Sequence, residues 1–440
     1  MFGNLTGLLI LHIEQTSAHM KSQKLYSSTQ HAYRRVRSVT SALLELDTMV
    51  RDQLNKGKVV GILTTDVSAG FNLVSKEILV PKMARFGFGQ ESCDLLEDYL
   101  TGRQTQVKVK NVLSPPVSLD TGVGEGSVLG PNFFSCGMTD VSVVAKRVKV
   151  DLMNTDKVDV WVNQIEYADD CTPIMAADTE AELQQASNKM LAGYNAFYSA
   201  NGLKLNESKC HLLVVRPGKK TMTLTCAGSN EVEKIKLLGL HIDNQMTYKH
   251  HAGVVVGRVL GKVEALERVK CKASFKTMSE CTVALVHSTI DFCSELYLRD
   301  ETNQKKVQKA LNAAMRMLLN KVMGDSCTDM LRTLDWLNVA NMHRWVCIRT
   351  LRRMKDFPSM MPETYSKLKM NRDPERDLRY NSLKIDWRVN TKWARESFIS
   401  NAVNLYNVLG LHGRLFMDKD EARDSIKSSI VETFGNANIK

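Results

Sequence analysis

The chain has 440 residues, enough for roughly three domains of ordinary size. Hydrophobic residues make up 43% of it and charged residues 24%, as in globular proteins, and no apolar run approaches the ~18 residues of a membrane span, so we expect no membrane partner. The net charge of +11 and the pI of about 9.1 favour an anionic partner, nucleic acid first, although a merely basic soluble protein has the same balance.

The N-terminal apolar run, GLLILHI, is short and no basic region precedes it, so we do not expect a signal peptide. The ten cysteines are scattered and none forms a C-x-x-C pair, which argues against a zinc site and against a disulfide framework. This cysteine usage predicts a reducing compartment, the nucleus or the cytoplasm.

Residues 38–57 have the apolar spacing of a helix, which Ser38 can cap and Gly57 can close. The apolar run at residues 59–63 is typical of a strand that is buried on both faces. Asp66 stands just beyond that run. A carboxylate at the end of a buried strand is either a turn residue or part of a functional site.

A helix is predicted at residues 91–101, and the alternating stretch QTQVKVKNV, residues 104–112, predicts a half-buried strand. The glycine-rich segment TGVGEGSVLGPNFF follows at residues 121–134. Its four glycines alone indicate only a flexible loop, and no Gly-Lys-Ser/Thr follows that would make it a P-loop.

Residues 158–175 predict two strands joined by a turn at residues 167–170, and a helix follows at residues 179–202. Beyond residue 250 the pattern is mostly helical. Basic residues spread through this part form either a solvated surface or a groove for a phosphate backbone: Arg258, Lys262, Arg268, Lys270, Lys305, Lys306, Lys309 and Arg316.

Asp169 and Asp170 are adjacent carboxylates at the predicted turn, and they repel each other unless water or a cation intervenes. A solvent-facing turn would hydrate them, whereas Mg²⁺ would bind carboxylate oxygens and keep its other positions for water and phosphates. Two such ions about 4 Å apart can hold both oxygens of a phosphoryl transfer. Asp66 is the natural third ligand if its strand lies beside this hairpin.

Six segments, taken in order, resemble motifs of the reverse transcriptases of non-LTR (LINE-like) retrotransposons. They are QHAYRRVRSVTSALL (30–44), DVSAGFNLV (66–74), GVGEGSVLGPNFF (122–134), YADD (167–170), NGLKLNESKC (201–210) and LLGLHIDNQMTYKHH (237–251). A C-terminal stretch, residues 396–415, is also similar to a segment of such elements. The order of the motifs makes the resemblance more specific than YADD alone.

The resemblance implies a catalytic role for four residues. Asp66, Asp169 and Asp170 would hold two Mg²⁺ ions, with Mn²⁺ as an alternative, and Lys209 would act as general acid to the leaving pyrophosphate, unless it is a plain surface lysine.

Five further residues would contact the nucleotide. Arg34 would meet the triphosphate, and Phe71 would exclude a ribose 2′-hydroxyl, unless it is a core aromatic. Glu125, Gly126 and Ser127 would lie near the template or the incoming base.

The fold implied is an α+β right-hand polymerase (fingers, palm, thumb) with a helical C-terminal extension. The expected domains are partial fingers at 1–57, a palm with fingers insertions at 58–248, a helical thumb at 249–330 and the C-terminal extension at 331–440. The partners would be an RNA template, a DNA primer and dNTPs. The sequence does not indicate the oligomeric state.

Three functions are compatible with these motifs. The first is an RNA-directed DNA polymerase with two-metal nucleotidyl transfer to a primer 3′-OH. The second is a catalytically weakened remnant that only binds nucleic acid. Three features favour this second function: Glu125 in place of the family's Gln, Pro81 within an expected helix, and an expected loss of fingers and endonuclease segments. The third, an RNA-directed RNA polymerase, is disfavoured by Phe71.

Overall fold

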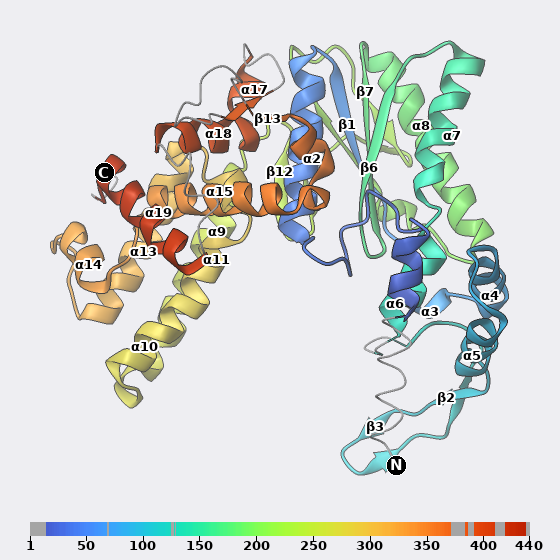
Figure 1. Cartoon of the computed structure of the whole chain (residues 1–440), viewed down its shortest axis with the longest axis horizontal. Helices are drawn as coiled ribbons and strands as arrows, with labels where there is room; N and C mark the ends of the chain where they lie inside the picture. Colours follow the sequence, from blue (N-terminus) through green and yellow to red (C-terminus); the bar gives the residue numbers. More distant parts are fainter. Residues whose placement is uncertain are drawn as a thin grey trace. The chain divides into compact units, whose positions relative to one another are not determined.

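The computed structural model describes residues 15–67, 70–124, 127, 129–370, 383–385, 391–409 and 419–436 (Figure 1). The chain divides into two compact units. The first unit comprises residues 1–39, 58–214 and 218–232, and the second comprises residues 40–57, 215–217 and 233–440. This division does not separate fingers, palm, thumb and extension, so the four predicted domain boundaries stay a prediction.

The first unit is built on a four-stranded sheet in the order β6–β7–β1–β8. Its strands are β1 (Val59–Thr64), β6 (Trp161–Tyr167), β7 (Asp170–Ala177) and β8 (His211–Val215). The strand at 59–63 and the two strands joined at 167–170 form as predicted, and β7 pairs antiparallel with both β6 and β1. β1 and β7 are almost entirely buried, which explains their continuous apolar character.

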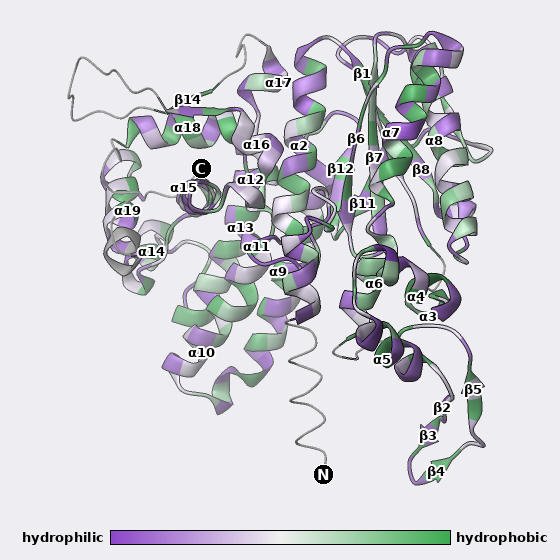
Figure 2. Cartoon of the chain, turned by 45° about the vertical axis from the view of Figure 1, so that its right-hand side comes forward, coloured by the Kyte–Doolittle hydropathy of each residue, from purple (hydrophilic) through white to green (hydrophobic). Residues whose placement is uncertain are grey.

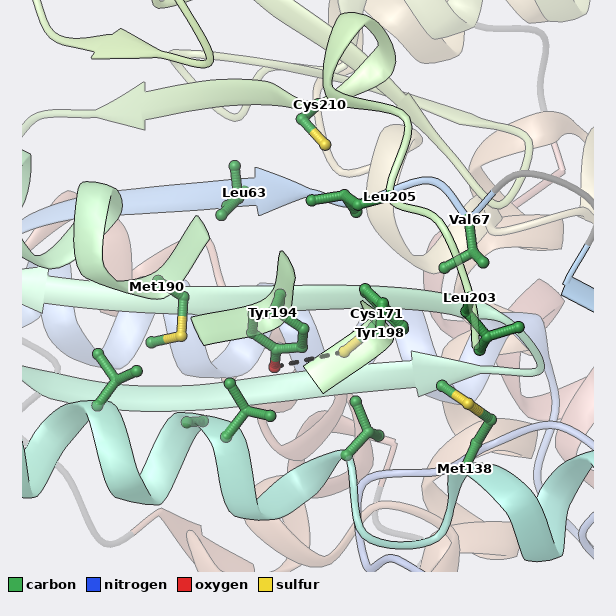
Figure 3. Close-up of a cluster of buried hydrophobic side chains, with 14 of the residues drawn as sticks. Leu63, Val67, Met138, Cys171, Met190, Tyr194, Tyr198, Leu203, Leu205 and Cys210 are labelled. Carbon is green, nitrogen blue, oxygen red and sulfur yellow. Dashed lines mark hydrogen bonds between the residues drawn. The ribbon is translucent and has the colours of Figure 1, made fainter. Parts of the chain in front are cut away.

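Two helices, α7 (Ser142–Asp151) and α8 (Glu180–Ala200), pack side by side and contact strands of this sheet (Figure 1). α8 begins where predicted, because Thr179 and Glu182 form a capping box. Figure 3 shows Tyr194 and Tyr198 in the apolar core, with the Tyr194 hydroxyl 3.4 Å from the Cys171 sulfur of β7. The helices therefore hold the sheet through large buried side chains.

Three helices lie before the sheet's hairpin in the chain and pack together: α4 (Lys76–Arg85), α5 (Gln90–Leu100) and α6 (Gly130–Met138). α5 confirms the helix predicted at 91–101. Pro81 lies inside α4, where its exposed position lets water satisfy the carbonyl that the missing N–H leaves free. A short helix, α3 (Gly70–Leu73), precedes α4.

The prediction of one half-buried strand at residues 104–112 is wrong. Residues 103–119 form a ribbon of β2 (Arg103–Thr105), β3 (Lys108–Val109), β4 (Val112–Leu113) and β5 (Val117–Leu119), in which β2 pairs with β5 and β3 with β4 (Figure 2). Its side chains are nearly all exposed. The chain reverses between the paired Val109 and Val112, where Lys110 has a φ of 55°. Alternation marks extended chain but does not show where a two-residue turn interrupts it.

The remaining short strands of the first unit are β9 (Thr225–Cys226) and β10 (Ser229–Asn230). The second unit is mainly helical and contains two β-hairpins, β11 (Lys234–Leu237) with β12 (Leu240–Asp243), and β13 (Leu368–Met370) with β14 (Leu383–Ile385). Its helices are α2 (Val39–Asn55), α9 (Lys249–Val269), α10 (Phe275–Thr282), α11 (Ser288–Asp291), α12 (Ser294–Tyr297), α13 (Glu301–Leu319), α14 (Cys327–Leu334), α15 (Val339–Asp356), α16 (Pro362–Ser366), α17 (Lys392–Arg395), α18 (Phe398–Val408) and α19 (Lys419–Phe434). In the ranges that the structure covers, no helix is long and apolar enough to cross a membrane.

A buried ionic cluster lies inside the second unit around Asp47 of α2. The Asp47 carboxylate accepts hydrogen bonds from Arg51 (2.9 Å), from both terminal nitrogens of Arg299 (3.0 Å each) and from the Tyr248 hydroxyl (2.8 Å). Burial alone would raise the pKa of Asp47, but the charges of Arg299 and Arg51 outweigh it and lower that pKa to about 2. The cluster thus joins segments far apart in the sequence.

Candidate active site

The three candidate aspartates lie at the same end of the sheet of the first unit. Asp66 lies two residues beyond the end of β1, Asp169 lies in the turn between β6 and β7, and Asp170 is the first residue of β7. Thr65 pairs with Cys171 through an N–H···O bond of 3.3 Å and a hydroxyl bond of 2.6 Å. Because these partners flank Asp66 and Asp170, the neighbouring strands hold the carboxylate-bearing segments together, and the strand before Asp66 does lie beside the hairpin.

The three carboxylates at this end of the sheet also interact electrostatically. The pKa of Asp170 is raised to about 6, first by burial and then by the negative charges of Asp169 and Asp66. Burial and the neighbouring carboxylates both disfavour the ionised form of Asp170, which a nearby positive charge would favour. Such a site favours the binding of a cation.

Lys209 supplies one positive charge, with its ammonium nitrogen 3.1 Å from an oxygen of Asp66. It lies on a 3₁₀ turn, Glu207–Lys209, and its side chain is 64% exposed. The turn is anchored to Asp66 itself, because the Asn206 N–H donates to the Asp66 carbonyl at 2.8 Å. The structure therefore places Lys209 beside Asp66, and its role as general acid stays a prediction.

In the part of the chain that the structure describes, no three His, Cys, Asp or Glu side chains are arranged as a ready metal cage. Mg²⁺ does not require one, since it is usually held by one or two carboxylates together with water and substrate phosphates. The donor set of Asp66, Asp169 and Asp170 consists of hard carboxylate oxygens, which Mg²⁺ prefers as ligands. These residues fit a divalent cation by their chemistry.

Phe71, the candidate sugar gate, lies on α3 and stacks on the buried Phe134, with ring centroids 4.3 Å apart and planes 13° apart. The short helix lies close to the turn that carries Asp169, since a Cβ added to Gly70 would be 3.6 Å from the Cβ of Asp169. Phe71 is only partly buried against the core. Its ring is thus held on one side by Phe134 in the neighbourhood of the aspartates.

The glycine-rich segment packs on the chain beside Phe71 over its described part. Val123 donates its N–H to the Phe71 carbonyl at 2.8 Å. Gly122 has a φ of 90°, and a Cβ there would lie 2.9 Å from Asn72, so this position requires glycine. Ser127 accepts the Gly130 N–H at 3.0 Å at the start of α6, while Glu125 and Gly126 lie outside the described residues.

Arg34, the candidate triphosphate ligand, is bound within its own loop. Its guanidinium donates to the Ser27 carbonyl at 3.1 Å and lies 4.4 Å from the centre of the Tyr26 ring. The neighbouring Tyr33, which the sequence did not mark as a site residue, is 51% exposed. Burial and then the charge of Asp169 raise the pKa of Tyr33, so this hydroxyl lies within electrostatic range of the site.

Gln30 is a second residue that sequence reasoning missed, although it opens the first quoted motif. Its side-chain amide forms hydrogen bonds to Ala168 within the YADD turn. Only the place of Gln30 at the head of that motif could have marked it, because the contact joins residues 138 positions apart.

Comparisons with known proteins give the family of this chain. A family model described as "Reverse transcriptase (RNA-dependent DNA polymerase)" matches residues 8–242. A curated protein of Drosophila melanogaster, "Probable RNA-directed DNA polymerase from transposon BS", is 22% identical over 314 residues, which cover 68% of this chain and 33% of that protein. The chain therefore spans about a third of the length of this curated relative.

Solved structures of yeast telomerases are also similar. Apo telomerase from Candida tropicalis is 12% identical with a TM-score of 0.40, covering 97% of this chain and 61% of that one. Telomerase from Candida albicans, in complex with a fragment of telomeric RNA, is 12% identical with a TM-score of 0.35, covering 81% of this chain and 57% of that one. The family match supports the right-hand polymerase fold.

Proposed function

We propose that this chain, which belongs to the reverse transcriptase family, is the polymerase part of a non-LTR retrotransposon protein. In this proposal it extends a DNA primer on an RNA template with dNTPs. One observation carries the proposal. Asp66, Asp169 and Asp170 lie at one end of the β1–β7 pair, where their charges act on one another. That arrangement suits nucleotidyl transfer and is otherwise costly, because like charges repel.

Two divalent ions bound there would supply Lewis-acid stabilisation of the attacking and leaving oxygens, with Mg²⁺ as the natural choice and Mn²⁺ as an alternative. Asp66, Asp169 and Asp170 would hold them. The remaining work falls to the protein: Lys209 donates a proton to the leaving pyrophosphate, and Phe71 excludes a ribose 2′-hydroxyl. Arg34 would have to leave its loop contacts to meet a triphosphate.

The glycine-rich segment, with Glu125, Gly126 and Ser127, would lie near the template and the incoming base. Its described part supports this, because it is bonded to the backbone of Phe71. All ten cysteines are unpaired, which supports a reducing compartment such as the nucleus or the cytoplasm.

The second candidate is a weakened remnant that only binds nucleic acid. The observation that favours it is Glu125, where an ionised side chain would stand near phosphates. Pro81 argues for it less than the sequence suggests, since α4 continues through this residue.

The deciding experiment is extension of a DNA primer on an RNA template with Mg²⁺ and dNTPs, beside a measurement of primer–template binding. We expect the parent chain to extend the primer, and Asp66→Ala and Asp169→Ala to bind but not extend. Asp178→Ala is the matched control, because Asp178 follows the opposite end of β7 and is 72% exposed. Extension by either site variant would reject the triad, whereas binding without extension by the parent would favour the remnant.

A further inference from the structure

The YADD turn has an unusual backbone for its sequence. Tyr167 and Asp170 are the last paired residues of β6 and β7, so Ala168 and Asp169 alone form the loop. Ala168 has a φ of 56°, in the left-handed region that two-residue hairpins normally fill with Gly, Asn or Asp. A residue with a Cβ is strained in this region, and such strain persists only where the surroundings enforce the conformation.

One side chain holds both polar backbone groups of Ala168. The Gln30 amide nitrogen donates to the Ala168 carbonyl at 3.2 Å, and the Gln30 amide oxygen accepts the Ala168 N–H at 3.0 Å. The same oxygen also accepts the Ala32 N–H at 2.9 Å. Gln30 is 6% exposed, so its amide is fixed between the two segments rather than free in solvent.

The segment that carries Gln30 is itself anchored to β6. It pairs with Glu166 as a short parallel strand, in which the His31 N–H donates to the Glu166 carbonyl at 2.8 Å and the Glu166 N–H donates to Thr29 at 3.0 Å. The buried Glu166 carboxylate then accepts the hydroxyls of Ser27 (2.7 Å) and Thr29 (2.5 Å). These contacts with β6 thus fix the position of Gln30 beside the turn.

We propose that Gln30 is a positioning residue of the polymerase site, which fixes the Ala168 backbone and thereby the direction of Asp169 and Asp170. The inference rests on the proposed function, but Gln30 acts through the turn and touches neither substrate nor metal. Without its amide, the half-buried Ala168 can bond to water, and the strained turn is free to relax. The two neutral hydrogen bonds together favour the held conformation of the turn over relaxed conformations by a factor of about 30.

The experiment measures Mn²⁺ binding to the free protein by electron paramagnetic resonance, with no nucleotide or nucleic acid present. We expect Gln30→Leu to weaken Mn²⁺ binding by about 10- to 30-fold and to lower kcat for primer extension to a similar extent, with little change in KM for primer–template. If Gln30→Leu does not fold, Gln30→Asn keeps the amide but is one methylene too short to reach both groups of Ala168.

The chain offers a matched control in Gln184 of α8. Its amide nitrogen donates to the Thr225 carbonyl at 2.8 Å and its oxygen accepts the Thr225 N–H at 2.7 Å, the same two-point contact away from the aspartates. Gln184→Leu should therefore leave Mn²⁺ affinity unchanged. In an Ala168→Gly background, where φ is no longer strained, the effect of Gln30→Leu should shrink to about threefold.

The outcomes separate the inference from the proposed function. If the parent chain binds Mn²⁺ and extends primers, and Gln30→Leu does both equally well, the positioning role is overturned while the polymerase function stands. Equal losses of Mn²⁺ affinity in the Gln30→Leu and Gln184→Leu variants would also overturn the positioning role. If the parent chain neither binds Mn²⁺ nor extends primers, the polymerase function is rejected, and the inference is rejected with it.

Discussion

Replacing Lys209 by alanine should slow nucleotide addition strongly and leave stability almost unchanged. The Lys209 ammonium lies 3.1 Å from Asp66, but the two side chains are 64% and 36% exposed. An ion pair this open to water contributes about 1 kcal/mol or less to folding. A proton donor to the leaving group contributes about 10²- to 10⁴-fold in rate, which corresponds to roughly 2.7–5.5 kcal/mol of activation free energy. Loss of the ion pair would therefore change the free energy of unfolding slightly, whereas loss of the proton donor would change the rate of nucleotide addition strongly.

The assay is the single-nucleotide addition rate at saturating dNTP, measured across pH, beside thermal unfolding of the same protein. Lys220→Ala is the control for the loss of an ion-paired lysine, because Lys220 is 48% exposed and lies 2.6 Å from Glu231, whose own side chain is 9% exposed. Lys209→Arg separates charge from proton transfer, since a guanidinium keeps its proton near neutral pH. We expect Lys209→Arg to be nearly as slow as Lys209→Ala.

Two results would refute this reasoning. A Lys209→Ala rate within threefold of the parent's would make Lys209 a surface partner of Asp66. A Lys209→Arg rate equal to the parent's would mean that the positive charge beside Asp66, rather than a transferable proton, is what the reaction uses.

Three further predictions concern sugar choice, nucleic-acid binding and pH. Phe71→Val should raise ribonucleotide over deoxynucleotide incorporation, and an unchanged ratio would make Phe71 a core residue that stacks on its neighbour. Lys305, Lys306 and Lys309 of α13 are exposed, and their joint substitution by alanine should reduce the slope of log affinity for nucleic acid against log salt concentration by about 2–3. The reason is that each phosphate contact contributes roughly 0.7–0.9 to that slope. An unchanged slope would mean that these lysines form a solvated surface. Burial raises the pKa of Glu45 from 4.5 to about 7 despite its hydrogen bonds, so its folded form binds a proton more tightly than its unfolded form. The free energy of unfolding should accordingly fall by about 3 kcal/mol as pH rises from about 4.5 to about 7, and urea titrations should show a flatter pH dependence for Glu45→Gln.

The sequence predicts the catalytic core of the fold well, because its signals are local. The apolar run of β1 and the hairpin of β6 and β7 follow from short patterns, and strand pairing then brings Asp66 to Asp170. The capping box at Thr179 needs only four consecutive residues to be recognised. These features depend on neighbours in the chain, which sequence patterns describe directly.

The features that sequence reasoning missed depend on contacts between distant residues. Asp47 looks like an ordinary polar residue of α2, yet it is fully buried because Arg299, 252 positions away, pairs with it. The contact of Gln30 with the turn and the stacking of Phe71 on Phe134 are likewise invisible before the chain folds. Charge and aromaticity identify candidates, but only packing shows what each one contacts.

The charge balance of the site has a consequence for how a metal would bind. The Lys209 ammonium lies 3.1 Å from Asp66, while burial and then the charges of Asp169 and Asp66 raise the pKa of Asp170, so a cation beside Asp170 would favour its ionised form. Yet the described residues form no cage of three ligands, so an ion bound without substrate would retain much of its water. The phosphates of a dNTP supply the missing oxygen ligands and offset the positive charge that the metal brings. Metal and nucleotide should therefore increase each other's affinity by the same factor, as linkage requires.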